Sequence, residues 1–404
     1  MRRRGAEREL EGRPGMLRLT SGRDFRLIWT AGIASQLGDW SARLALALLV
    51  LERGGGATAV GVVGLLFVAP WLGVGQLLTR WSARYGRRVV LVACDTFRGI
   101  AFIVIGTWSP PTVPLLVIVG LAALADPVFE ATKSAFVTEI VPKDDYSEAI
   151  QVTHAANQAA SLAGYALGGL VVGFVGAEFT LAMNGVTFLV SSSLIIAVSR
   201  PGTHAEAEAS SPSLAAGLRF LRDDRLSAVA FAATVVAVTA AMSVESQVAV
   251  YGKVVAAFDD QVIGLLSAVT PAATLVAGAM LRTTGDDTAL LRRGLRTGGA
   301  AAAGGSILLF SGVGGVGAFV AFALVGVIFS FVTMTNVVVG RRLPDDNRVT
   351  IFSVLQTGVF LGLSVGALSG GILSEATSPE RAACAALAIA GASLFAAIGQ
   401  VGPE

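Results

Sequence analysis

The chain has 404 residues, of which 54% are apolar and only 14% are charged, and its formal net charge is +2. Soluble proteins carry about 25% charged residues, so this composition excludes an ordinary soluble domain and favours a protein embedded in lipid. Cys94, Cys384 and the two histidines have no spacing that predicts a disulfide framework or a metal site. The sequence contains no G-x-x-x-x-G-K-[ST] loop and no H-E-x-x-H motif. We therefore expect no enzyme, no cofactor, no metal and no direct use of ATP.

The first segment, 1–24, is rich in arginine and lacks the apolar run of a signal peptide. It predicts a disordered cytoplasmic arm, with translation starting at Met1 or at Met16. Apolar stretches follow, and a membrane-spanning helix needs about 20 residues of this kind. Twelve spans are predicted: 25–51, 57–78, 88–108, 113–141, 148–175, 179–198, 226–251, 261–281, 290–311, 315–339, 349–374 and 381–401.

The longest internal polar segment, 200–225, predicts a cytoplasmic linker. Its stretch 214–221 has the pattern of a short amphipathic helix at the membrane surface. The linker divides the spans into an N-terminal six-helix bundle, 25–199, and a C-terminal six-helix bundle, 226–404. The expected fold is therefore all-α, with twelve transmembrane helices in two pseudo-symmetric halves.

An internal repeat supports this division. Val63-Gly64-Leu65-Leu66 recurs as Ile263-Gly264-Leu265-Leu266, and Pro142, Gly164, Gly168 and Gly169 recur at one constant offset as Pro344, Gly366, Gly370 and Gly371. Duplicated membrane halves are typical of secondary transporters, whose substrate site lies where the halves meet.

The distribution of arginine predicts the orientation of the chain. Positive charges in short loops mark the cytoplasmic side. They concentrate in the arm, the linker and the loops at 79–88, 282–296 and 341–348, whereas the opposite loops offer only Arg53, Lys253 and Arg381. We expect a multi-pass protein in the plasma (inner) membrane of a bacterium, with both termini in the cytoplasm.

Twelve spans in two halves, a central cytoplasmic linker and a basic loop after the second span resemble the major facilitator superfamily. Local patterns narrow this resemblance: Phe25-Arg26-Leu27 leading to Gly38-Asp39, Asp95 with Arg98 in the third span, Pro142 after the fourth, and Pro344-Asp345 with Arg348-Val349 before the eleventh. In this order and spacing they are similar to the drug–proton antiporter branch that includes macrolide and siderophore exporters. The resemblance implies a major facilitator fold and transport by alternating access.

The sequence departs from the superfamily pattern at two places. The loop after the second span keeps Arg84, Gly86, Arg87 and Arg88, but Ala83 stands where the family has an aspartate that latches the cytoplasmic surface. The antiporter pattern of the fifth span keeps Gly164, Gly168 and Gly169, but Tyr165 replaces its proline. The second departure weakens the antiporter assignment more than the transporter assignment.

Ionisable residues within spans are costly in hydrocarbon and therefore point to function. Asp39 near the middle of the first span has Arg43 one turn away, so the two are expected to neutralise each other. Glu130 and Lys133 are three residues apart and are expected to pair, which would leave Asp126 as the unpaired acid. Asp126, Asp39 and Glu130 are the candidates for proton coupling, and their expected charge partners are Arg43, Lys133, Asp95 and Arg98.

Asp95 and Arg98 share one face of the third span, and a structural pair is the expected role. Glu245 in the seventh span is expected near the outer surface as an ordinary solvated carboxylate. The buried amides could line a cavity or bridge helices, and the substrate-contact candidates among polar residues are Gln36, Asn157, Asn336 and Gln356.

Glycines spaced by four residues give smooth helix faces that allow close packing. Gly164, Gly168 and Gly169, with the matching Gly366, Gly370 and Gly371, serve either static packing or sliding between the two halves.

The leading interpretation is a proton-coupled exporter of a small amphipathic compound. The alternatives are a facilitator or importer, and a non-transporting sensor or partner subunit with a transporter fold. The expected partners are the lipid bilayer, a small-molecule substrate and protons, with no nucleic acid, and a monomer is expected.

Overall fold

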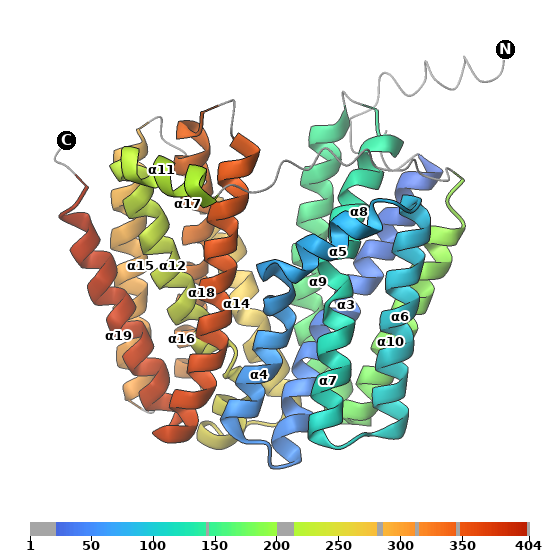
Figure 1. Ribbon diagram of the computed structural model, residues 1–404. Coiled ribbons are helices and arrows are strands. Elements are labelled where there is room, and N and C mark those ends of the chain that lie inside the picture. The colour runs from blue at the N-terminus through green and yellow to red at the C-terminus, as the bar shows by residue number, and fades with distance from the viewer. Residues whose placement is uncertain are drawn as a thin grey trace. The chain divides into compact units, whose positions relative to one another are not determined.

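The computed structural model of the chain describes residues 22–142, 145–199, 214–280, 286–311, 315–344 and 348–401 (Figure 1). All regular structure within these ranges is helical, and they contain no β-strand. The helices are α3 (Arg23–Glu52), α4 (Gly56–Val68), η1 (Ala69–Leu72), α5 (Val74–Ser82), α6 (Arg87–Trp108), α7 (Thr112–Ala123), α8 (Ala125–Ile140), α9 (Tyr146–Val175), α10 (Ala177–Ile196), α11 (Leu214–Asp223), α12 (Arg225–Glu245), α13 (Val248–Val250), η3 (Tyr251–Val255), α14 (Asp260–Met280), α15 (Asp287–Phe310), α16 (Val316–Phe329), α17 (Phe331–Arg342), α18 (Arg348–Ala376) and α19 (Pro379–Ile398).

Nine helical segments among the described residues are long and apolar enough to cross a membrane. Three further predicted spans are helical, but each is either too short or not apolar enough to meet this criterion. α3 and α15 contain several charged residues, and α4 with η1 is apolar but short. The all-α membrane fold is thus confirmed, and the count of twelve spans is consistent with it but stays a prediction.

The described chain forms two compact units. Unit 1 takes its residues from Met1–Ala42, Val74–Gly164 and Glu178–Glu208, and unit 2 takes its residues from Arg43–Gly73, Tyr165–Ala177 and Ala209–Glu404. α3 and α9 therefore contribute to both units. These boundaries follow local packing, and the division of the chain into two repeated six-helix bundles remains a prediction.

Unit 1 is held by an apolar core between the N-terminal part of α3 and helices α6, α8 and α10. Phe25, Leu91, Phe129, Phe136 and Ile195 are almost completely buried there. Burying such a side chain contributes about 1.5–3 kcal/mol. The close contact of α6 with α10 depends on glycine, since a Cβ on Gly99 would lie 3.1 Å from the carbonyl oxygen of Gly185.

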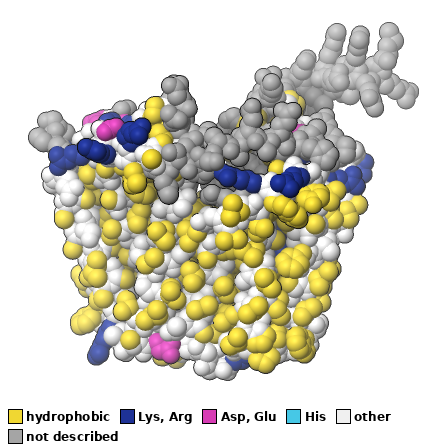
Figure 2. Space-filling view, in the orientation of Figure 1, with side chains coloured by type: hydrophobic (Ala, Val, Ile, Leu, Met, Phe, Trp, Pro, Cys, Tyr) yellow, Lys and Arg dark blue, Asp and Glu magenta, His cyan; other side chains and the backbone are white. Residues whose placement is uncertain are grey.

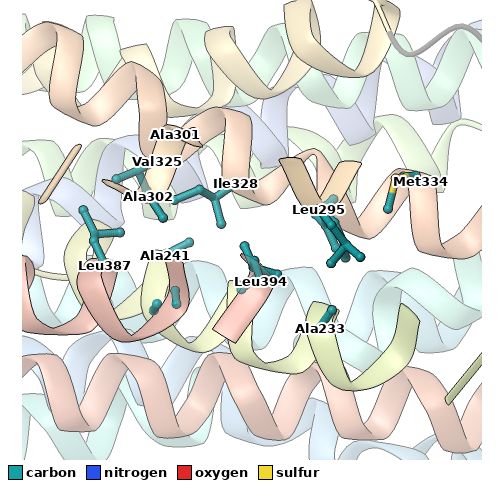
Figure 3. Close-up of a cluster of buried hydrophobic side chains, with 14 of the residues drawn as sticks. Ala233, Ala241, Leu295, Ala301, Ala302, Val325, Ile328, Met334, Leu387 and Leu394 are labelled. Atoms are coloured by element: carbon teal, nitrogen blue, oxygen red, sulfur yellow. The ribbon is translucent and has the colours of Figure 1, made fainter. Parts of the chain in front are cut away.

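Unit 2 contains a larger apolar core, which Figure 3 shows in close-up. Most of its buried side chains come from α12, α15, α16, α17 and α19, and others come from α13, η3, α14 and α18. Leu295 and Ala302 on α15 lie with Ile328 on α16 and with Leu387 and Leu394 on α19. Small alanines alternate with branched side chains, so neighbouring helices approach closely without large voids.

The second predicted span, 57–78, is not one continuous helix. α4 ends at Val68, the 3₁₀ turn η1 contains Pro70, and Gly73 has φ of 142° before α5 begins. Proline removes a backbone donor, and a positive φ of this size suits only glycine. This predicted span was wrong as a single helix because Pro70 and Gly73 act together, and the interruption separates α4 in unit 2 from α5 in unit 1.

The fourth predicted span also contains an interruption. α7 ends at Ala123 and α8 begins at Ala125. Pro127 has no N–H to bond the carbonyl oxygen of Ala123, so the helical ladder loses its bond at this point. Leu124 between the two helices keeps αR backbone angles, and Asp126 lies directly beside this interruption.

The visible surface fits a lipid environment. Figure 2 shows hydrophobic side chains over most of the visible surface of the described residues, with few charged side chains among them. Exposed apolar side chains include Phe97, Val113 and Val117 in unit 1 and Val276 and Ile307 in unit 2. Such a surface would associate in water, whereas in a bilayer it contacts lipid tails.

Part of the predicted linker is helical. α11 covers the expected amphipathic stretch 214–221, whereas Arg200–Ser213 lies outside the described residues, as does most of the predicted N-terminal arm. The start of α12 is tied to the end of α17, because Nε and Nη2 of Arg342 donate to the carboxylate of Asp224 at 2.6 and 2.8 Å. The hydrogen bonds from this guanidinium hold the pKa of Asp224 below its usual range.

Candidate functional site

Arg98 lies at the centre of a buried ionic cluster in unit 1. It projects from α6, and its Nη2 donates to Asp95 at 2.6 Å on the same helix. Its Nη1 lies 3.0 Å from Asp126 on α8 and 3.5 Å from Asp39 on α3. One guanidinium therefore contacts three carboxylates from three helices.

The three carboxylates differ in their access to water. The side chain of Asp95 is completely buried, that of Asp39 is 11% exposed and that of Asp126 is 18% exposed. Asp95 also accepts a hydrogen bond of 2.5 Å from the hydroxyl of Ser191. Asp95 is thus fixed between two donors, while Asp126 is the most exposed carboxylate of the cluster.

Two aromatic rings pack against the guanidinium. Its Cζ lies 4.2 Å from the ring centre of Phe188 and 4.8 Å from that of Phe129. The cation–π attraction stabilises the charge and excludes water from it. Arg98 Nε has no hydrogen-bond partner within the part of the chain that the structure describes. The guanidinium therefore keeps one unused donor.

A second ion pair adjoins the first through Phe129. Lys133 Nζ lies 2.6 Å from Glu130 Oε1 and 5.5 Å from the Phe129 ring centre. Gln36 Nε2 donates to the same oxygen of Glu130 at 3.3 Å, and Trp40 Nε1 donates to Gln36 Oε1 at 3.1 Å. A polar chain thus runs from α3 to α8 beside the Arg98 cluster.

One glycine of α3 makes room for a close helix contact beside the cluster. A Cβ on Gly32 would make only ordinary contact with Lys133 Nζ, at 3.6 Å. A Cβ on Gly38 would overlap Thr187 and Asn184 of α10. Glycine at position 38 therefore lets α3 approach α10 closely at the level of Asp39.

The structure changes the interpretation of two predicted acids. Asp126 is not the unpaired acid expected from spacing along α8, because Arg98 of α6 reaches it. Asp39, expected to pair with Arg43 on its own helix, also has Arg98 as a cation partner from another helix. The expected pairs Asp95–Arg98 and Glu130–Lys133 are present. The coupling roles of these residues stay predictions.

Two serines of the cluster were not predicted. Ser35 Oγ lies 3.5 Å from Arg98 Nη2, and Ser191 binds Asp95. The signal for the second was the polar run Ser191-Ser192-Ser193 within an apolar span. Of the amide candidates, Gln36 joins the Glu130 chain, while Asn157, Asn336 and Gln356 lie half-buried on α9, α17 and α18.

The basic loop motif before α6 makes contacts that hold helix ends in unit 1. Arg87 pairs with Glu139 of α8 and donates to the Ala135 carbonyl oxygen at 2.7 Å. Arg88 donates to the carbonyl oxygens of Val198, at 3.1 Å, and Ile196 at the end of α10. Arg84 and Gly86 precede them in the turn before α6. Glu139 thus pairs with this basic motif, which has Ala83 in place of the family's aspartate.

The repeated glycines lie at close helix contacts. Gly164 faces α3 in unit 1, where a Cβ would lie 2.7 Å from the Leu37 carbonyl oxygen. In unit 2, Gly169 meets Gly264, and Gly366 and Gly370 meet the α12 backbone. Gly168 is buried. A Cβ on Gly371 would lie 2.7 Å from the Ala57 carbonyl oxygen of α4. Close packing is thus evident, and sliding remains a prediction.

The described helices, their apolar surface and the buried charges define a multi-pass membrane protein of the secondary-transporter class. A model of the Major Facilitator Superfamily matches residues 28–367 of the sequence. The chain belongs to this superfamily.

The chain is also similar to individual members of the superfamily. The uncharacterized MFS-type transporter YfiS of Bacillus subtilis (strain 168) is 23% identical over 361 residues, which cover 84% of each chain. The crystal structure of the nucleoside transporter NupG superposes with a TM-score of 0.74 at 12% identity, covering 94% of this chain and 99% of that one. The POT family transporter PepTSo gives 0.70 at 13% identity, with 94% and 97% covered. At such low identities the two structures show the fold alone.

Proposed function

We propose that the protein is a proton-coupled exporter of the drug–proton antiporter type that moves a small amphipathic compound by alternating access. The compound would be a drug, a siderophore or a secondary metabolite. The observation that supports this most directly is the Arg98 cluster. Three carboxylates around one guanidinium, inside apolar helices, form a group whose charge balance a single proton changes.

The proposed mechanism uses Asp126 as the proton carrier. When ionised, Asp126 is held by Arg98 at 3.0 Å. A proton on this carboxylate removes one of the negative charges that surround the guanidinium and weakens the contact between α8 and α6. Arg98 then remains with Asp95 and Asp39, so the cluster has two arrangements that differ by one proton. A buried group that is stable both ionised and neutral is what coupling to a pH gradient requires.

A reconstitution experiment tests the proposed function. The purified full chain is first screened for ligand-induced thermal stabilisation against antibiotics, siderophores and metabolites. Compounds that stabilise it are then followed in proteoliposomes with an imposed pH gradient and an internal pH indicator. We expect the compound to move against its own gradient while protons move the opposite way. Movement that only equalises concentrations, with no proton flux, would favour a facilitator, and movement in the same direction as protons would favour an importer.

The proposal includes an orientation with both termini in the cytoplasm of a bacterium. The asymmetric distribution of arginine supports it. Reporter fusions after Arg53 and Lys253 are expected to report the outer side, and fusions after Arg84 and Ser210 the cytoplasm. Active alkaline phosphatase fused after Arg84 would contradict this orientation.

A further inference from the structure

A second membrane-embedded carboxylate, Glu245, lies in unit 2 and plays no part in the Arg98 cluster. It is the last residue of α12, within the apolar segment Arg225–Val255. The sequence suggested a solvated surface carboxylate, but the side chain is half-buried. The Glu245 side chain has neither a hydrogen bond nor an ion pair within the described part of the chain, although its charge interacts with that of Arg43.

The positively charged neighbour of Glu245 is Arg43, whose guanidinium stacks on an aromatic ring. The Arg43 guanidinium is close enough for its charge to act on Glu245, and the Glu245 carboxylate acts in turn on the neutral hydroxyl of Tyr165. Arg43 stacks over the ring of Phe67, with its Cζ 4.6 Å from the ring centre, and it has other interactions as well. Arg43 therefore moderates the charge of Glu245 without neutralising it through direct contact.

The helix is interrupted next to this carboxylate. α12 ends at Glu245, and after Ser246 and Gln247 the chain continues as the short helix α13 and the π-helical turn η3. The Gln247 side chain is 3% exposed, and its Oε1 has no hydrogen-bond partner among the described residues. Such interruptions within a span are frequent at functional sites because they release polar groups from the helical pattern.

Aromatic side chains lie on the helices packed against this segment. A Cβ on Gly64 of α4 would lie 3.3 Å from the Ser246 Cβ and 3.2 Å from the Ala367 Cβ of α18. Phe67 follows Gly64 by one turn on the same face of α4. Where the chain after α4 continues along α18, the rings of Trp71 and Phe360 stack, with their centres 5.3 Å apart. Ser246, the residue after Glu245, thus packs on small residues of α4 and α18, and the rings of Phe67, Trp71 and Phe360 lie further along these helices.

From this arrangement we propose that Glu245 binds the positively charged group of the transported compound, which would make that compound a lipophilic cation. An ionised carboxylate without a partner is costly in an apolar segment, and a bound cation relieves that cost. Neighbouring rings would contact the apolar body of the ligand and attract its charge. The inference rests on the proposed function and narrows its substrate from amphipathic compounds to cationic ones.

The test is a binding measurement that needs no gradient. Tetraphenylphosphonium carries a permanent positive charge, and triphenylphosphine oxide is an aromatic neutral counterpart. Binding of each to the detergent-purified full chain is measured by titration calorimetry for the wild type, Glu245→Gln, Glu245→Asp and the control Glu380→Gln. We expect Glu245→Gln to weaken tetraphenylphosphonium binding by about tenfold or more, which is about 1.4 kcal/mol. Glu245→Asp and Glu380→Gln should bind it nearly as the wild type does.

Arg43 supplies a test of opposite sign. Replacing it by glutamine removes a positive charge that opposes cation binding, so Arg43→Gln should bind tetraphenylphosphonium more tightly and triphenylphosphine oxide unchanged. The inference is overturned if the wild type does not bind tetraphenylphosphonium, or if Glu245→Gln binds it equally well. Equal loss of both probes would instead assign Glu245 a structural role. The binding titrations use no pH gradient, and the proteoliposome assay does not depend on tetraphenylphosphonium. A negative binding result would therefore overturn the role of Glu245 without deciding whether the protein is a proton-coupled exporter.

Discussion

We expect Asp126→Asn to abolish transport driven by a pH gradient while leaving folding, substrate binding and downhill exchange intact. Asparagine keeps the size of the side chain and can still accept a hydrogen bond from Arg98, but it cannot exchange a proton. Proteoliposomes containing the variant should therefore equalise a substrate gradient and fail to build one. The measurement is substrate accumulation under an inward or outward pH gradient, beside counterflow without a gradient.

The other two carboxylates around Arg98 provide matched controls. Asp95→Asn removes a charge from the same guanidinium at a completely buried position fixed by Ser191, so we expect lower thermal stability with coupling retained. Asp39→Asn is expected to alter substrate binding or the rate of exchange more than coupling. If Asp126→Asn still accumulates substrate at the wild-type rate, Asp126 is not the carrier. If Asp39→Asn alone loses uphill transport, the role belongs to Asp39.

The regular parts of this fold could be predicted because membrane-spanning helices have a simple physical signal. A run of about 20 apolar residues must satisfy its backbone hydrogen bonds internally, and the helix does this. The hydrogen bond missing at Pro127 has an equally simple cause, because proline has no backbone N–H. The interruption at Pro70 and Gly73 was missed because the apolar signal continues through it, although the dihedral angles of Gly73 do not allow a continuous helix.

The candidate site was predictable only within single helices. Spacing of three residues correctly paired Asp95 with Arg98 and Glu130 with Lys133, since such residues share a helix face. The contacts of Arg98 with Asp126 and Asp39 depend on how α3, α6 and α8 pack in unit 1. That packing is set by glycines such as Gly38 and by rings such as Phe129, whose effect appears only in three dimensions. Glu245 was expected to be solvated, and its partial burial was missed for the same reason, because neighbouring helices cover it.

The second large effect is expected from Arg98→Met, which leaves three carboxylates of the cluster without the cation that contacts them all. Removing one partner of a buried ion pair typically costs about 3–5 kcal/mol. A protein domain is stable by only about 5–15 kcal/mol in total. We therefore expect a large loss of folded protein at neutral pH, measured as monodisperse yield and as thermal unfolding followed by tryptophan fluorescence in detergent.

Two controls separate the charge of Arg98 from its packing. Lys133→Met removes the neighbouring buried cation, which contacts one carboxylate instead of three, so its effect should be clearly smaller. Arg98→Lys keeps the positive charge, but a compact ammonium cannot span three carboxylates as a planar guanidinium does, so intermediate stability is expected. Lowering the pH supplies protons that neutralise the unpaired carboxylates, so Arg98→Met should regain part of its stability in mild acid. An Arg98→Met protein as stable as the wild type at neutral pH would show that the cluster does not hold α3, α6 and α8 together, and the two-arrangement mechanism would then lose its physical basis.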